Sequence, residues 1–313
     1  MPSFVAMDLR QLQAFLAVVD HGGFTAAAKA THTVQSNVST HVARLERELD
    51  ATLIDRSSGR PTQEGEAVLS RVRRIQNELD SLESDVSSLR GSPQGLVRVG
   101  MIGTTARWFT PHLFEEMARV APDIQLVVTD ATTRSLELRL LDGELDLGIV
   151  ALPSDETEVL TTPIFSEKNI VVVPDNHELA KEQSITLARL AKHPLLLAAP
   201  GTPHRQALEE LFSQAGQRLL PKIEVDGLRL LASLAFQGHG ISIVPATAAP
   251  GWLSGPWRTI EVDGGMGERT VGLAARRRGM PTMAANVTRR AILNVLAHQA
   301  GSVPGLRLVN TER

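Results

Sequence analysis

The sequence predicts two parts: an α-helical winged helix-turn-helix domain that continues into a long helix, and an α/β domain of two lobes. Apolar residues recur at helical spacing from the start of the chain to about residue 90. After about residue 95, short apolar runs alternate with helical stretches, which is typical of βαβ units. With 313 residues and 42% hydrophobic content, the chain also exceeds the usual size of one compact core.

Three helices are expected within the first fifty residues. The first starts at Leu9 and closes on Gly22-Gly23, the second covers Phe24 to Ala30, and the third covers Val34 to Leu49. A turn of only a few residues separates the second from the third, as a helix-turn-helix requires, so the third is the expected recognition helix. The next segment, residues 51–61, contains Ser, Gly and Pro and predicts a small wing that completes the domain, residues 1–61.

A single long helix is expected over residues 62–91. Thr62 is a suitable N-cap, and Gly91 with Pro93 supplies the stop. Apolar residues follow a heptad spacing, which predicts a dimerisation seam: Val68, Val72, Ile75, Leu79, Leu82, Val86 and Leu89. The alternative is a helix packed on its own domain, but charged side chains on the other faces leave only a narrow apolar stripe and favour pairing between chains.

The composition limits the classes of site and protein. No cysteine occurs, which excludes disulfides, thiolate catalysis, cysteine-based zinc sites and thiol redox switches. No basic start followed by an apolar run is found, and no stretch approaches about 20 apolar residues, so we expect a cytoplasmic protein without a membrane segment. The net charge of -3 says nothing about nucleic acid, because a DNA-binding surface would be local.

Three segments together carry a family resemblance: FTAAAKA, VQSNVSTHVARLERELDATLIDR and TQEGEAVL. In this order they resemble the DNA-binding end of LysR-type transcriptional regulators, over residues 7–70. The order of strands and helices after Pro93 also resembles the effector domain of that family. The resemblance implies two lobes like those of type 2 periplasmic binding proteins, with a small-molecule effector between them.

Family members cross twice between their lobes, which sets the expected boundaries. Crossings are expected near Pro163–Glu167 and Gly264–Glu268. The effector-binding domain, residues 95–305, then divides into lobe I, about 95–163 and 268–303, and lobe II, about 167–264. Within it we expect helices from about Trp108 to Val120 and from Met283 to about Gln299.

The resemblance also implies which residues meet DNA. The start of a recognition helix enters the major groove, where polar side chains match the donors and acceptors of base edges. The base-reading candidates are Gln35, Ser36, Asn37, Thr40 and His41. The phosphate-binding candidates are Thr25, Arg44, Arg56 and Arg60. The alternative for each residue alone is a solvated helix face, and residues 1–61 carry six Lys/Arg against six Asp/Glu, so this domain is neutral.

Effector contacts are expected where loops lead into helices, because free N–H groups there favour anions. In lobe I the candidates are Thr104, Thr105 and, with less support, Thr133; in lobe II they are Thr202, His204 and Arg205. The alternative is that the threonines merely cap helices. Two helix N-termini, threonine hydroxyls and Arg205 favour a small carboxylate or another anion as effector.

The predicted function is a transcriptional regulator that binds an inverted-repeat operator in double-stranded DNA as a homodimer or homotetramer. The alternative is a cytoplasmic small-molecule binding protein without regulatory DNA binding, which would leave residues 1–91 unexplained. We find no nucleophile elbow, P-loop, HExxH motif or catalytic dyad, so we expect neither an enzyme nor a cofactor or metal.

Overall fold

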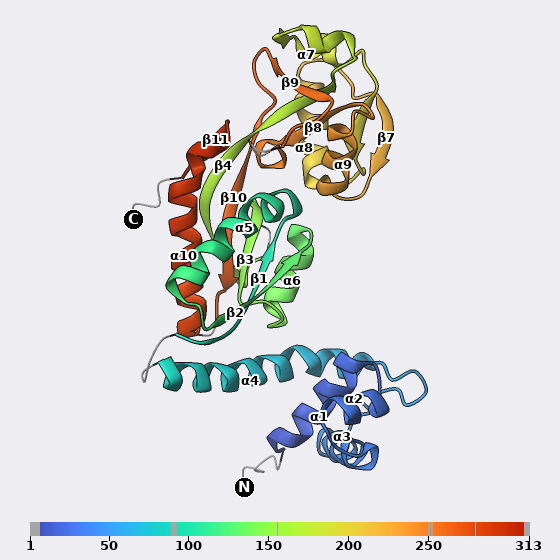
Figure 1. Cartoon of the computed structure of the whole chain (residues 1–313). Coiled ribbons are helices and arrows are strands. Elements are labelled where there is room, and N and C mark those ends of the chain that lie inside the picture. Colours follow the sequence, from blue (N-terminus) through green and yellow to red (C-terminus); the bar gives the residue numbers. More distant parts are fainter. Residues whose placement is uncertain are drawn as a thin grey trace. The chain divides into compact units, whose positions relative to one another are not determined.

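The computed structural model describes residues 7–88, 93–154, 156–249, 251, 253–278 and 280–309. The chain divides into two compact units, residues 1–89 with 141–144 and residues 90–140 with 145–313. The N-terminal unit contains helices and one antiparallel β-bridge, between Ile54 and Pro61, and strands alternate with helices in the rest (Figure 1). The predicted fold class is confirmed.

The N-terminal unit contains the helix-turn-helix. Its helices are α1 (Leu9–His21), α2 (Phe24–Ala30), α3 (Gln35–Leu49) and α4 (Gln63–Ser88). Helix α1 starts with a capping box, in which Asp8 and Gln11 bond to each other's backbone N–H groups, and it ends at Gly22 in the left-handed region, at φ 73°. The turn before α3 places His32 in the left-handed region as well, at φ 52°.

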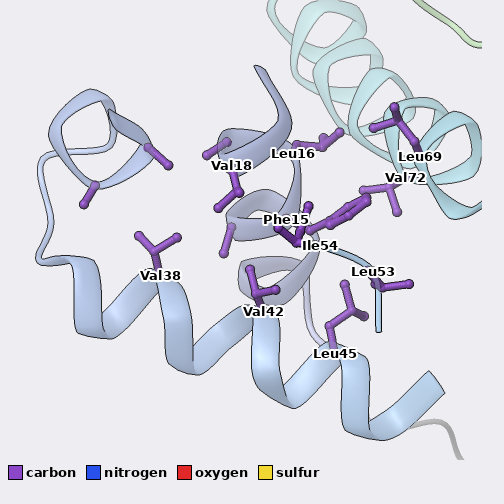
Figure 2. Close-up of a cluster of buried hydrophobic side chains, with 14 residues drawn as sticks. Phe15, Leu16, Val18, Val38, Val42, Leu45, Leu53, Ile54, Leu69 and Val72 are labelled. Carbon is purple, nitrogen blue, oxygen red and sulfur yellow. The ribbon is translucent and has the colours of Figure 1, made fainter. Parts of the chain in front are cut away.

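The core of this unit lies between α1 and α3, as Figure 2 shows. Phe15 and Val18 of α1 face Val42 and Leu45 of α3, and Ile54 of the wing closes the cluster. All five side chains are fully buried. One face of α3 is therefore committed to the core, and its opposite face remains free for a partner.

A single carboxylate joins the wing to α3. Oε1 of Glu46 accepts the backbone N–H groups of Leu53 at 2.9 Å and Ile54 at 3.2 Å, and its Oε2 accepts a guanidinium N–H of Arg56 at 3.0 Å. At the tip, hydrogen bonds from Ser57 and Ser58 lower the pKa of Asp55 to about 2. The wing is thus fixed by hydrogen bonds at both its base and its tip.

The first two positions of the expected seam pack within their own unit. Val72 is 3% exposed and belongs to the helix-turn-helix core, and Val68 packs against that core. A heptad pattern does not show whether an apolar residue is covered by its own domain or by a second chain. The predicted seam therefore included two residues that pack on their own domain. Farther along α4, Ile75, Leu82 and Val86 are exposed, and Leu89 lies outside the described residues.

Two lobes share the sheet of the second unit. The lobe I strands are β1 (Gly95–Met101), β2 (Ile124–Asp130), β3 (Leu147–Leu152), β10 (Glu268–Arg276) and β11 (Leu306–Leu308). The lobe II strands are β5 (Ser184–Ile185), β6 (Leu195–Ala198), β7 (Pro221–Val225), β8 (Ile241–Pro245) and β9 (Trp257–Val262). The order is β2-β1-β3-β10-β4-β8-β6-β7, where β4 (Val159–Pro174) runs from one lobe into the other (Figure 1).

The register of β4 shows where the chain first crosses. Residues 159–168 of β4 pair with β10, and residues 169–174 pair with β8 or β9. The strand therefore continues to residue 168 within lobe I, a little beyond the expected crossing. The chain returns between β9 and β10, where Asn169 binds the carbonyl of Met266.

Helices cover the sheet in both lobes. Lobe I has α5 (Gly103–Val120), α6 (Thr133–Leu141) and α10 (Met283–Gln299), and lobe II has α7 (Leu187–Leu190), α8 (Pro203–Gln214) and α9 (Leu228–Phe236). Short 3-10 turns are η1 (Glu178–Lys181), η2 (Ala246–Ala248) and η3 (Ala300–Ser302). Helix α5 begins at Gly103 rather than near Trp108. The prediction missed its first turn because small residues there show no apolar periodicity.

We predict that Glu46→Ala destabilises the N-terminal unit by about 1–3 kcal/mol, because two buried backbone N–H groups lose their acceptor. Urea unfolding followed by circular dichroism measures the change. Glu64→Ala, at an exposed position in the first turn of α4, is the control and should cost only a few tenths of a kcal/mol. Equal effects of the two changes would refute the anchoring role of Glu46.

Candidate nucleic-acid interface and effector region

The first turns of α3 present a polar surface. Gln35, Ser36, Asn37 and Thr40 are exposed, whereas Val38 between them is buried in the core. Ser36, Asn37 and Thr40 share one face, because residues three or four positions apart lie on the same side of a helix, and Gln35 is exposed as the first residue of α3. The structure therefore brings four of the five base-reading candidates together on one accessible surface.

Hydrogen bonds connect this surface to its neighbours. The hydroxyl of Thr25 donates to Oε1 of Gln35 at 3.3 Å, and Nδ2 of Asn37 donates to the hydroxyl of Thr33 at 3.2 Å. The Thr40 hydroxyl donates to the carbonyl of Ser36 at 2.8 Å, which uses its donor within the helix. These bonds hold Gln35 and Asn37 in place before any partner binds.

His41 is more enclosed than the other candidates, and Arg56 is exposed but already engaged by neighbouring side chains. His41 is partly buried, and its Nδ1 has no hydrogen-bond partner among the described residues. The guanidinium of Arg56 binds Ser39 and Glu46, both at 3.0 Å, and lies 5.0 Å from the centre of the Phe24 ring. Arg56 thus holds the wing against α2 and α3.

The remaining phosphate-binding candidates, Thr25, Arg44 and Arg60, are exposed, as Arg56 is.

A buried ion pair lies where the two lobes meet. Arg269 of β10 and Glu167 of β4 are direct cross-strand partners, and Nε of the arginine donates to Oε1 of the glutamate at 2.8 Å. Glu167 has no exposed surface, and its Oε2 accepts the backbone N–H of Thr247 at 2.7 Å. Arg269 also donates to the hydroxyl of Thr104 in the first turn of α5, at 2.7 Å.

This network connects elements that are far apart in the sequence. It joins β4 and the start of β10 to α5 of lobe I and to η2, which directly follows β8 of lobe II. Sequence reasoning missed Glu167, Thr247 and Arg269, because residues 167 and 269 are 102 positions apart and belong to no local motif. The only available signal was that both lie beside the expected crossings.

Two further groups lie near the start of α5. The hydroxyl of Thr105 is fully buried and has no hydrogen-bond partner among the described residues. Asp130, at the end of β2, forms an ion pair of 2.6 Å with Arg229 of α9 in lobe II. A Cβ built on Gly103 would come within 3.0 Å of the Asp130 carboxylate, so the glycine permits a close approach there.

The other effector candidates already have intramolecular partners. The Thr202 hydroxyl caps α8 by accepting the N–H of Arg205, and the Thr133 hydroxyl accepts the N–H of Ala151 at 3.1 Å. The Arg205 side chain is 8% exposed and binds Glu209 at 2.8 Å and Glu224 at 2.7 Å. Arg205 thus holds α8 against β7, and among the expected effector contacts only Thr105 has a buried polar atom without a partner.

His204 is held in its neutral form. Its Nε2 lies 3.0 Å from the carbonyl of Ile243, an acceptor, so this nitrogen carries the ring proton. Burial lowers the pKa of His204 to about 4; the bond to Ile243 acts in the opposite direction, and the charge of Arg269 lowers the pKa further. The ring is therefore uncharged at neutral pH.

Within the described part of the chain, no group of three or more His, Asp or Glu side chains could hold a metal ion. No helix in the same part is both long and apolar enough to cross a membrane.

Comparisons with known proteins agree with both halves of the chain. The family described as "Bacterial regulatory helix-turn-helix protein, lysR family" matches residues 9–66, and the one described as "LysR substrate binding domain" matches residues 90–297. The chain belongs to the LysR family. The resemblance drawn from the N-terminal motifs is thereby confirmed, and regulation through DNA binding is favoured over a role in small-molecule binding alone.

Relatives support the same family. The RuBisCO operon transcriptional regulator of Allochromatium vinosum is 31% identical over 241 residues, which cover 76% of this chain and 79% of that protein. Full-length OxyR from Pseudomonas aeruginosa has a TM-score of 0.73 at 24% identity, with 98% of this chain and 99% of that chain covered. CbnR in complex with its target DNA has a TM-score of 0.69 at 23% identity, with 94% and 100% covered. These two structures share the fold of this LysR-type chain.

We predict that acid destabilises this LysR-type protein partly through His204. Its pKa is about 4 in the folded state against 6.5 for the free side chain, so the unfolded chain binds more protons in this range. Stability should fall as the pH drops from about 6.5 toward 4, by up to about 3 kcal/mol. Urea unfolding at pH 7 and pH 4.5 should show a smaller loss for His204→Gln than for the unaltered protein.

The control for that measurement is His239→Gln, at an exposed histidine of lobe II. It should leave the pH dependence of stability unchanged. If His204→Gln loses as much stability on acidification as the unaltered protein, protonation of His204 does not contribute to acid unfolding.

Proposed function

We propose that the protein reads an inverted-repeat operator through the exposed first turns of α3, one helix for each half-site. The observation that carries this proposal is the exposed polar set Gln35, Ser36, Asn37 and Thr40 on a helix whose opposite face is fixed in a core. Amide and hydroxyl groups there match the donors and acceptors of base edges in the major groove. Their orientation by Thr25 and Thr33 lowers the entropy lost on binding.

Different roles are proposed for the remaining candidates. Arg44 and Arg60 are exposed and would meet phosphates, as would the hydroxyl of Thr25. Arg56 would act mainly by holding the wing, since Glu46 and Ser39 already occupy its guanidinium group. His41 would contact DNA only through Nε2, because its Nδ1 is buried.

We propose that two chains pair through α4. Ile75, Leu82 and Val86 lie at heptad positions and are 42%, 62% and 44% exposed. Exposed apolar residues at this spacing form a stripe that a second copy of the same helix would cover. Pairing would supply the two recognition helices that an inverted repeat requires, as a homodimer or within a homotetramer.

We propose that the small-molecule effector binds between the lobes, next to the first turn of α5. The buried Thr105 hydroxyl and the Arg269 guanidinium favour this place, and the free N–H groups of a helix start would suit a carboxylate. Arg205 would contribute by positioning α8. The protein would act in the cytoplasm, where its DNA is, and by binding rather than by catalysis.

The double variant Gln35→Ala/Ser36→Ala should lose sequence-specific DNA binding by at least about a hundredfold, since several base contacts of about 1–3 kcal/mol would disappear. Binding to random duplex DNA, which depends on phosphates, should change little. An operator selected from random DNA, followed by mobility shift at fixed salt, measures both affinities.

The matched control is Ser213→Ala/Gln214→Ala, an exposed pair on α8. It should bind the operator as tightly as the unaltered protein. If the unaltered protein selects no sequence from random DNA, recognition by α3 is refuted and the role in small-molecule binding alone returns.

The variant Leu82→Glu should weaken pairing by about a hundredfold or more, because it would place a charge in the apolar seam. Sedimentation of the full chain at micromolar concentration should then show assemblies of half the mass or less. Arg74→Glu places the same carboxylate at an exposed position of α4 outside the apolar stripe and should keep the mass of the unaltered protein. Unchanged mass for Leu82→Glu would exclude α4 as the seam.

A further inference from the structure

Val34, the residue before α3, has an unusual environment for an apolar side chain. It is 65% exposed, more than any other large apolar side chain described in the N-terminal unit. The next most exposed, Leu82, Leu9 and Val86, lie on α4 or at the start of α1. Single exposed apolar residues are common, so exposure alone does not indicate a role. The position of Val34 at the start of α3 is the second observation that indicates a role.

Val34 is the N-cap of α3 and provides no side-chain hydrogen bond to it. Its carbonyl accepts the N–H of Asn37 at 3.0 Å, but the first N–H groups of the helix receive no capping side chain. Other helices of the chain do have such caps: Asp8 for α1, Thr202 for α8 and Thr282 for α10. Valine at an N-cap is disfavoured relative to Ser, Thr, Asp or Asn, by about 0.5–2 kcal/mol.

Folding therefore does not explain this valine, since it neither caps the helix nor enters the core. It lies directly beside the polar reading surface, between Thr33 and Gln35, whose side chains are held by Asn37 and Thr25. These polar groups are fixed on either side of it in the sequence. An apolar group at this place would face whatever the start of α3 meets.

We propose that Val34 determines operator specificity by contacting the C5-methyl group of a thymine in each half-site. This inference rests on the proposed reading of DNA by α3. In the major groove the thymine methyl is the apolar group that distinguishes one base pair from the others, and small apolar side chains recognise it. A capping serine or threonine would instead satisfy the helix and offer the groove a polar group.

The size of the effect follows from the apolar surface covered. Burial of one methyl group strengthens binding by about fourfold. Replacement of that thymine by deoxyuridine removes only the methyl group and keeps the hydrogen-bonding atoms of the base. A loss of about fourfold in each half-site, confined to one position, is the expected signature.

The test uses the full chain and an operator selected from random duplex DNA. Each thymine of both half-sites is replaced in turn by deoxyuridine, and dissociation constants are measured for the unaltered protein and for Val34→Ala. For the unaltered protein, one position should weaken binding by about 16-fold when both half-sites are replaced, which is four squared. Val34→Ala should bind the thymine operator more weakly and lose this sensitivity.

Val34→Thr is the second variant, because it keeps one methyl group and adds a capping hydroxyl. It should fold at least as stably as the unaltered protein and still lose part of the sensitivity to deoxyuridine. Val120→Ala, at an exposed valine of α5, should keep the full sensitivity.

The possible failures can be told apart. If no deoxyuridine replacement changes the binding of the unaltered protein by twofold, or if Val34→Ala responds like the unaltered protein, the inference is overturned while reading by α3 stands. If no sequence is selected at all, the proposed function fails first.

Discussion

The N-terminal unit depends on the double use of α3. One face of this helix supplies Val38, Val42 and Leu45 to the core against α1, and the other must stay polar and accessible at its start. Because the buried residues recur at three- and four-residue spacing, the orientation of Gln35 and Ser36 follows from the packing of the core. Glu46, farther along the same helix, fixes the wing, so one rigid element carries the base-reading candidates and also anchors the segment that holds Arg56 and Arg60.

In the second unit the corresponding constraint is a buried charge. Glu167 and Arg269 lie opposite each other on β4, which crosses between the lobes, and β10, which begins where the chain returns, and an unpaired charge there would be strongly unfavourable. The pair must stay together, which fixes the register of the strands at the crossing. Thr104 is bound to the same arginine, so the first turn of α5 is tied to the crossing strands. A ligand at this turn would therefore act directly on the junction of the lobes.

Periodicity made the helices predictable, including the limits of α2 and α10, and the polar start of α3 could be read from the sequence. Three features could not. Small residues hid the first turn of α5, and a heptad pattern could not show that Val72 packs within its own unit. The sequence also does not show which acidic residue pairs with a given arginine. Glu224 binds Arg205 and Glu167 binds Arg269, and both pairs join residues that are distant in the sequence.

The neutral charge of the DNA-binding domain has a consequence for regulation. The domain carries six basic and six acidic residues within positions 1–61, and Glu46 already pairs with Arg56. Few cations remain for phosphates, so a single domain gains little affinity from counterion release. Affinity must then come from base contacts and from several domains that bind at once. Binding by several domains strengthens affinity only if the spacing of the domains matches the spacing of the half-sites in the operator. A change in spacing alone could therefore switch such a regulator, without altering any contact made by one domain.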